Sequence, residues 1–104
     1  MRRGARKGRR TMVVYAHVDS SEFRVGGPRF GLVVSKAVGD SVTRHRVSRR
    51  LRHIAAEVVG DLDPDLMVVI RANPASATAS HDDLVRDFRK ALDVASARAR
   101  EVRS

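Results

Sequence analysis

Residues 44–58 constrain the fold of this chain more than any other stretch of its sequence. Apolar residues recur there at the spacing of one buried helical face: Val47, Leu51, Ile54 and Val58. Five arginines fall within residues 44–52, and no carboxylate lies between Asp40 and Glu57. Such a density of positive charge repels itself unless a polyanion lies against it. The stretch therefore predicts a helix with one side in a core and a cationic band that favours nucleic acid as its partner.

The residue types in this band favour phosphate as the group that it contacts. Arginine can donate two parallel hydrogen bonds to a phosphate and can stack on bases, which lysine cannot match. Arg44 and Arg46 lie in the first turn, where the helix dipole disfavours cations. Phosphates docked at the free backbone N–H groups of that turn would offset the cost.

Both ends of the expected helix carry recognisable signals. Gly39 permits a turn with positive φ ahead of the helix. Three residues can cap the first turn: Asp40, Ser41 and Thr43. Gly60 is expected to end the helix as a C′ glycine. The three aspartates of residues 61–65 then form an acidic turn, and a calcium loop is disfavoured because its glycine and distal glutamate are missing.

Charge is distributed unevenly along the 104 residues, whose formal net charge is +9. Residues 1–52 carry fourteen Lys/Arg and three Asp/Glu, a net +11, and residues 53–104 carry seven and nine, a net −2. The first half therefore presents an electropositive surface with a salt-dependent attraction for phosphates. The chain has no cysteine, which excludes disulfides and thiolate sites and fits a reducing cytoplasm. Its apolar runs are too short to span a membrane, so no membrane partner is expected.

Alternating apolar residues predict two strands, at residues 11–18 and 29–35, joined by a hairpin loop at residues 19–28. The face suited to a core carries Met12, Val14, Ala16, Val18, Phe30, Leu32 and Val34. The opposite face carries Val13, Tyr15, His17, Gly31, Val33 and Ser35. Residues 66–72 form a nearly continuous apolar run, which is typical of a central strand covered on both faces.

A second amphipathic helix is expected after Ser80, which with Asp83 resembles a capping box. Its buried face is Leu84, Phe88, Ala91, Leu92 and Ala95. Residues 1–10 contain six basic residues and are interpreted as a flexible arm, and residues 99–104 as a disordered tail. The order strand, strand, helix, strand, helix predicts a single α+β domain over residues 1–104, a two-layer sandwich of helices packed on one mixed sheet.

Residues 29–52 resemble the protein subunit of bacterial ribonuclease P. Members carry a strand of the form R-x-G-L-x-V-S-K-K/R-x-G, which runs into G-N-A-V-x-R-N-R and then K-R-x-x-R on the helix. The matching positions here are Gly31, Leu32, Val34, Ser35, Lys36, Gly39, Val42, Arg44, Arg46, Arg49, Arg50 and Arg52. Asp40, His45 and Ser48 depart from the pattern, although His45 can still stack and Asp40 can still cap. Residues 68–74 and the helix from residue 82 also look like the family's last strand and helix.

The resemblance implies a left-handed β-α-β crossover, as in the ribosomal S5 domain 2-like fold, an exception to the usual handedness. It implies an accessory subunit that binds the catalytic RNA and the 5′ leader of precursor tRNA. The RNA and its Mg²⁺ ions would remove the leader, and the protein would contribute no catalytic or metal-binding side chain. The implied RNA-binding residues are Lys36, Arg44, His45, Arg46, Arg49, Arg50 and Arg52. The implied leader-binding cleft consists of Val13, Tyr15, Gly31, Val33 and Ser35.

Two consequences of this resemblance stay open. Tyr15 offers a ring on which leader bases can stack, but it could instead pack under the N-terminal arm. Family members usually begin with a helix whose arginine and phenylalanine form one wall of the cleft, and this chain begins roughly where that helix would end. Apolar sheet surface is therefore expected to be uncovered and to favour self-association.

Two other functions compete with this reading. A self-sufficient nuclease needs an acid and a base facing one pocket, and the four histidines (His17, His45, His53 and His81) show no such pairing in the sequence. A non-enzymatic RNA-binding module such as a ribosomal protein has the same composition. The block of motif residues around Ser35 and Lys36 favours ribonuclease P over that alternative.

Overall fold

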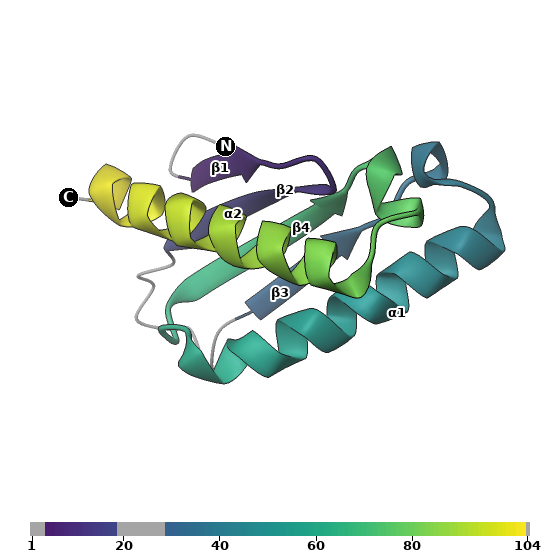
Figure 1. Cartoon of the computed structure of the whole chain (residues 1–104). Helices are drawn as coiled ribbons and strands as arrows, with labels where there is room; N and C mark the ends of the chain where they lie inside the picture. The colour runs from purple at the N-terminus through teal and green to yellow at the C-terminus, as the bar shows by residue number, and fades with distance from the viewer. Residues whose placement is uncertain (1–3, 19–28, 104) are drawn as a thin grey trace.

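The protein is a four-stranded sheet with two helices packed on one of its faces (Figure 1). The computed structural model describes residues 4–18 and 29–103. The strands lie in the order β1-β2-β4-β3. The pairs β1–β2 and β2–β4 are antiparallel, and β3 runs parallel to β4. This mixed sheet with its two helices confirms the α+β fold expected from the sequence.

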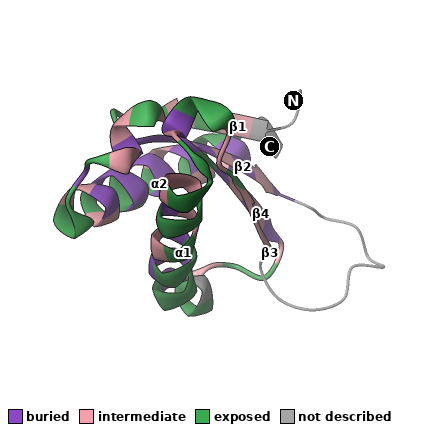
Figure 2. Cartoon of the chain, turned by 90° about the vertical axis from the view of Figure 1, so that its right-hand side faces the viewer, coloured by how far each residue is buried: buried purple, intermediate pink, exposed green. Residues whose placement is uncertain are grey.

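Strands β2 (Met12–Val18) and β4 (Leu66–Ala72) form the centre of the sheet. Along both strands, every second side chain is buried beneath the helices and the intervening ones are less buried. The buried set of β2 is the one predicted from its alternation. The expectation that residues 66–72 are covered on both faces is wrong, because both helices lie on the same face of the sheet (Figure 2). Met67 and Val69 are therefore only half-buried, and Arg71 is exposed.

Strand β1 (Gly4–Gly8) corrects the interpretation of residues 1–10 as a flexible arm. It pairs antiparallel with the free edge of β2, with Arg6 opposite Tyr15. Ala5 packs against the core, and the Arg9 N–H closes the β1–β2 turn on the Met12 carbonyl at 2.8 Å. The ladder is made by backbone groups, which a charged, glycine-containing sequence supplies as well as an apolar one. Residues 1–3 and the predicted hairpin loop, 19–28, lie outside the described residues.

Strand β3 (Arg29–Val33) ends two residues earlier than predicted and leads through a 3₁₀ turn, η1 (Lys36–Val38), into helix α1 (Ser41–Val58). The helix crosses over the sheet and returns to β4, which gives the parallel β3–α1–β4 unit. The predicted stripe is buried along α1, with Ala55 added to it. Gly60 does not end α1 in a left-handed conformation. It lies within a 3₁₀ turn, η2 (Val59–Asp61), and Gly39 is the single glycine with positive φ in the described part of the chain.

Helix α2 (His81–Arg103) lies across β1 and β2 and buries the predicted apolar face. The Asp83 N–H donates to Ser80 Oγ at 3.1 Å, as expected of the predicted cap. The expectation of a disordered tail from residue 99 is wrong for the described residues, since Ala99 is buried and Arg100 forms an ion pair with Asp63. Within the described part of the chain, neither helix combines the length and the apolar character that a membrane crossing requires.

Candidate RNA interface

The turn before α1 sets where the cationic helix begins. Gly39 has φ 154°, and a Cβ added there would lie 3.0 Å from Thr43 Cγ2, so the position favours glycine. The Thr43 backbone N–H donates to Asp40 Oδ1 at 2.8 Å, which makes Asp40 the cap. This backbone hydrogen bond, the Thr43 side chain and the nearby Arg46 and Arg44 charges lower the pKa of Asp40 below its ordinary 3.8. The departure from the family's asparagine therefore keeps the cap but adds a negative charge.

The cationic side chains of α1 gather on its outer side, as the periodicity predicts. His45, Arg46, Arg49 and Arg52 are exposed, and Arg44 and Arg50 are half-buried. Arg46 also donates to the Ala77 carbonyl at 3.1 Å, which orients its guanidinium towards the turn η3 (Pro74–Ala77). Lys36 is exposed on η1, just ahead of the helix. Six of the seven predicted RNA-binding residues thus share one helix, and the seventh lies on the turn that precedes it.

Within residues 4–18 and 29–103, no carboxylate lies within 4.0 Å of a nitrogen of any α1 arginine. Arginines elsewhere do find acidic partners: Arg9 pairs with Asp87 at 3.1 Å, and Arg10 pairs with Asp83 at 3.4 Å. The five α1 arginines, called the arginine band below, therefore form no ion pair with the described part of their own chain. An unpaired cluster of this kind has the charge to hold several phosphates.

Two surface hollows open between the side chains of the band. One, of about 540 Å³, is lined by Ser41, Val42, His45, Arg46 and Arg49. The other, of about 300 Å³, is lined by Arg49 and Arg50 with two histidines, His53 of α1 and His81 of α2. Both are open and cationic, which suits phosphate oxygens. The second hollow extends the basic surface from α1 to the first residue of α2.

This second hollow corrects the expectation that nothing pairs with His53. His53 and His81 line the same cavity, and His53 Nε2 lies 3.4 Å from Glu57 Oε1. The signal was invisible in the sequence because the two histidines come from different helices. Both residues are exposed, and arginines rather than a defined substrate pocket surround them. The cluster therefore fits an anion-binding surface better than an acid–base pair.

The second predicted surface is the sheet face that the helices leave open. Strand register places side chains on this face in three rows: Arg6–Tyr15–Val69–Gly31, His17–Met67–Arg29 and Val13–Arg71–Val33. Tyr15 is half-buried between Arg6 and Val69. A ring flanked by aliphatic side chains and arginines suits a single-stranded polynucleotide, because bases stack on the ring and phosphates pair with the cations.

Four of the five predicted cleft residues lie on this open face: Val13, Tyr15, Gly31 and Val33. Ser35 lies beyond the end of β3, where its carbonyl accepts the Val38 N–H at 3.1 Å. Met67, Val69 and Arg71 also lie on this face and were not predicted to, although their alternation within residues 66–72 could have identified them. Arg6 was not predicted either, because its position depends on the unexpected strand β1.

The large apolar side chains that are exposed in the described residues are Val33 and Val42, at 46% and 74%. Val33 lies on the open sheet face, and Val42 lies in the first turn of α1. This is little apolar surface to drive self-association. The expected self-association stays a prediction.

The fold and the arginine band define a small basic α+β protein with a surface suited to RNA. Residues 1–96 match the family described as Ribonuclease P. The ribonuclease P protein component of Rhodococcus erythropolis is 53% identical over 96 residues, covering 88% of this chain and 76% of that protein. That of Corynebacterium diphtheriae is 48% identical over 96 residues, covering 89% and 81%. The chain belongs to the ribonuclease P protein family, the accessory component of a ribonucleoprotein enzyme.

Solved structures show the same fold at lower sequence identity. The Staphylococcus aureus RNase P protein superposes with a TM-score of 0.76 at 20% identity, covering 88% of this chain and 81% of that one. The Thermotoga maritima RNase P protein superposes with a TM-score of 0.70 at 15% identity, covering 90% and 83%. The family expected from residues 29–52 is thus confirmed, and an RNA partner comes with it.

Proposed function

We propose that this chain is the protein subunit of ribonuclease P, and that it binds the catalytic RNA through α1 and the 5′ leader of precursor tRNA on the open sheet face. The observation that carries the proposal is the arginine band without acidic partners. A fold gains nothing from five clustered arginines, whereas a folded RNA presents phosphates at that density. The residues assigned to the RNA contact are Lys36, Arg44, His45, Arg46, Arg49, Arg50 and Arg52.

The open sheet face is the proposed leader surface, with Val13, Tyr15, Gly31 and Val33 at its centre and Ser35 at its end. Stacking on Tyr15 and contacts with aliphatic side chains do not depend on base identity. Such a surface accepts leaders of different sequence, as a general processing enzyme requires. Arg6 and Arg71 add positive charge for the leader phosphates.

The family implies Mg²⁺, and the described residues do not gather a multi-ligand site for it. Mg²⁺ prefers carboxylate and other oxygen ligands, and no group of three or more His, Asp or Glu residues gathers there to hold a metal. Several carboxylates are already engaged, Asp63 by Arg100 and Asp87 by Arg9. As the resemblance to ribonuclease P implies, we assign the metal and the hydrolysis to the RNA subunit, and binding and orientation of the RNA to the protein. The proposal also keeps the cytoplasmic location expected for tRNA maturation in bacteria.

Reconstitution with a bacterial ribonuclease P RNA tests the proposal. Precursor tRNA is incubated with the RNA subunit at low Mg²⁺, with and without the protein, and correct 5′ cleavage is measured. We expect the protein to increase cleavage and to produce none without the RNA subunit. No gain would favour a non-enzymatic RNA-binding module such as a ribosomal protein. Correct processing by the protein alone would contradict the accessory role.

A substitution at Tyr15 tests the leader surface separately. Tyr15→Ala should weaken binding of precursor tRNA by about 1–2 kcal/mol, because one stacking contact is lost. Binding of mature tRNA and of the catalytic RNA should stay unchanged. Asp93→Ala, at an exposed position of α2 away from the sheet face, is the control. Equal losses for precursor and mature tRNA would contradict the assignment of the sheet face to the leader.

A further inference from the structure

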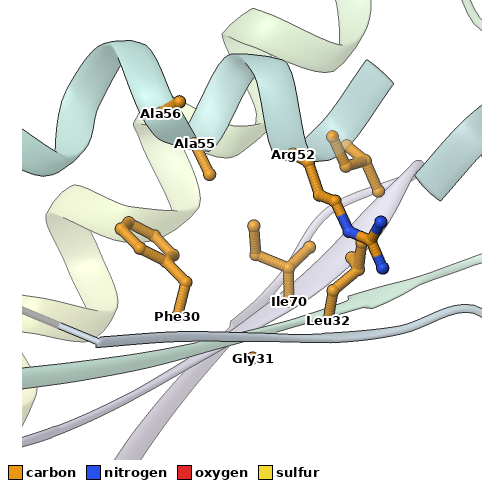
Figure 3. Close-up of a pocket in the computed structure, with 8 residues that line it drawn as sticks. Phe30, Gly31, Leu32, Arg52, Ala55, Ala56 and Ile70 are labelled. Carbon is orange, nitrogen blue, oxygen red and sulfur yellow. The ribbon is translucent and has the colours of Figure 1, made fainter. Parts of the chain in front are cut away.

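An apolar hollow lies between α1 and the edge strand β3, on the opposite side of the sheet from the proposed leader surface. Figure 3 shows Phe30, Ile70 and Leu32 rising from the sheet, with Ala55 pointing down from α1 above them. The hollow has a volume of about 430 Å³. Its remaining lining residues are Gly31, Leu51, Arg52 and Ala56.

Small residues on α1 create this hollow. Ala55 points towards the sheet with only a methyl group, and Ala56, at the rim, is exposed, so the space above β3 is not filled from α1. Phe30 and Leu32 are consequently only half-buried, although they lie on the helix-covered face. On the central strand β2, Met12 and Val14 on the same face are fully buried, at 0% exposed. Protein cores are close-packed, so an unfilled apolar space of this size beside an edge strand leaves room for a group from another molecule.

Positive charge surrounds the hollow, and no carboxylate lines it. The Arg52 guanidinium lies at its mouth, beside Leu32 (Figure 3). A second hollow, of about 330 Å³, shares Leu32 and continues along α1 past Val34, Ser41, Arg44, His45 and Ser48. Arg44 Nε is buried there without a hydrogen-bond partner within the described residues. Together the two hollows form one groove and meet at Leu32. It combines an apolar floor with the guanidinium groups of Arg44 and Arg52, whose residues are about 12 Å apart along the helix axis at 1.5 Å per residue.

We propose that this groove receives an unstacked base of the RNA that binds α1, with the base on Phe30, Leu32 and Ile70 and the adjoining phosphate on Arg52. The inference rests on the proposed function, because RNA is taken as the partner. A volume of 430 Å³ lies within the range of ligand-binding pockets, roughly 300–1,000 Å³. The Phe30 ring is held by Phe88, at a centroid distance of 6.4 Å. A fixed ring of this kind is a suitable platform for a base.

This site is distinct in chemistry from the arginine band. The band attracts any polyanion through charge, whereas the groove requires a group that is flat, apolar on its faces and attached to a phosphate. A single strand with an unstacked nucleotide satisfies both requirements. A base-paired helix does not, since its bases are inaccessible to an apolar groove.

Filling the hollow without changing charge separates the two sites. Ala55→Leu places a larger side chain over Phe30 and should lower the affinity for the catalytic RNA about tenfold, the loss expected for one stacked base. Ala97→Leu, on the exposed side of α2, is the matched control and should have no effect. Thermal unfolding of both variants, followed by circular dichroism, verifies that they are folded. The arginine band alone predicts no change for Ala55→Leu.

A direct probe covers the case in which Ala55→Leu does not fold. Adenosine 5′-monophosphate is titrated into the unsubstituted protein, and amide chemical shifts are followed by NMR, with ribose 5-phosphate as the control that lacks the base. We expect shifts at Leu32, Arg52 and Ala55 with the nucleotide but not with the sugar phosphate. Arg52→Gln should weaken these shifts several-fold, whereas Arg89→Gln should not.

Three results would overturn the inference. Equal shifts with ribose 5-phosphate would indicate an anion contact at Arg52 alone. Unchanged RNA affinity of a folded Ala55→Leu variant would exclude a base in the groove, even while RNA binding by the unsubstituted protein upholds the proposed function. Binding of an apolar peptide but not of the nucleotide at the same amides would assign the groove to a protein partner. Failure of the proposed function is a separate outcome, seen as no RNA binding by the unsubstituted protein.

Discussion

The two helices pack on the same face of one sheet through similar apolar stripes, but they differ in how their charges are satisfied. On α2, Arg86 pairs with Asp83 at 3.1 Å, and Asp87 pairs with Arg9 at 3.1 Å. On α1, the single ion pair among the described residues is His53 with Glu57 at 3.4 Å. Charged side chains of α2 thus take part in ion pairs within the fold, whereas the α1 arginines have no carboxylate partner among the described residues.

Asp87, in the N-terminal half of α2, is a buried charge whose hydrogen-bond partners lie within the fold. The Asp87 carboxylate is 1% exposed and accepts hydrogen bonds from the Thr11 backbone N–H at 3.2 Å and from Thr11 Oγ1 at 2.7 Å. Arg9 Nε donates to its other oxygen at 3.1 Å. These contacts tie the β1–β2 turn to α2 across more than seventy residues of sequence. A local departure from good charge pairing, as on α1, is typical of a functional site.

Removing the Asp87 charge should give the largest effect. Asp87→Asn should lower the free energy of unfolding by about 2–3 kcal/mol, because a buried, charge-assisted network loses its acceptor. Urea unfolding measures this. Asp93→Asn, at an exposed position of the same helix, is the control and should change stability by less than about 0.5 kcal/mol. Equal stability of the two variants would break the contrast between the helices.

Removing an α1 arginine should weaken RNA binding and leave the free energy of unfolding unchanged. Arg49→Ala should weaken binding to the catalytic RNA by about 1–3 kcal/mol, as for a charge-assisted phosphate contact. Its stability should not fall, since no partner is lost. Arg46→Ala should weaken binding similarly but also lose the contact with the Ala77 carbonyl. Arg89→Ala on α2 is the control, and a dissociation constant unchanged by Arg49→Ala would refute the assignment.

The cap of α1 should give an intermediate effect on stability. Asp40→Ala should lower the midpoint of urea unfolding, because the Thr43 N–H loses its acceptor. Asp40→Asn keeps an acceptor and removes the charge, so stability should be retained while RNA affinity rises a few-fold. Urea unfolding and RNA titration of the pair separate capping from charge. Reduced RNA affinity of Asp40→Asn would indicate a different role for this carboxylate.

Lowering the pH should change the free energy of unfolding least of all, because no change is expected near neutral pH. Burial alone would raise the pKa of Asp87, but the hydrogen bonds from Thr11 and the Arg9 guanidinium outweigh burial, so the pKa lies below its ordinary 3.8. The unfolded chain therefore binds this proton at higher pH than the folded one. Stability from Asp87 is present above about pH 4 and is lost as the pH falls through the folded pKa. Urea unfolding between pH 7 and 3 should show a steeper acid loss for the unsubstituted protein than for Asp87→Asn.

Local periodicity explains why much of the fold could be predicted. The stripe of α1 and the alternation of β2 follow from the repeat of each element, so the sequence shows which side of each is buried. The Gly39 turn and the caps at Asp40 and Ser80 are equally local. The candidate RNA-binding residues could be proposed from the sequence because six of the seven follow one another on α1 and Lys36 lies on the turn just before it.

Other features escaped prediction because their partners are distant in sequence. Strand β1 exists because the edge of β2 was available for backbone pairing. Arg71 lies on an open face because both helices pack on the other side of the sheet. The hollow that His53 and His81 share is formed only where α1 and α2 lie next to each other.

The family, the two helices, the inner faces of the strands and the density of positive charge on α1 can all be read from the amino-acid sequence, since each depends on residues close together in the chain. The folded structure is needed to show which charges have ion-pair partners, which sheet face stays uncovered and where an apolar hollow remains beside Arg52. Those properties depend on distances between elements, and side-chain packing sets such distances only when the whole chain has folded.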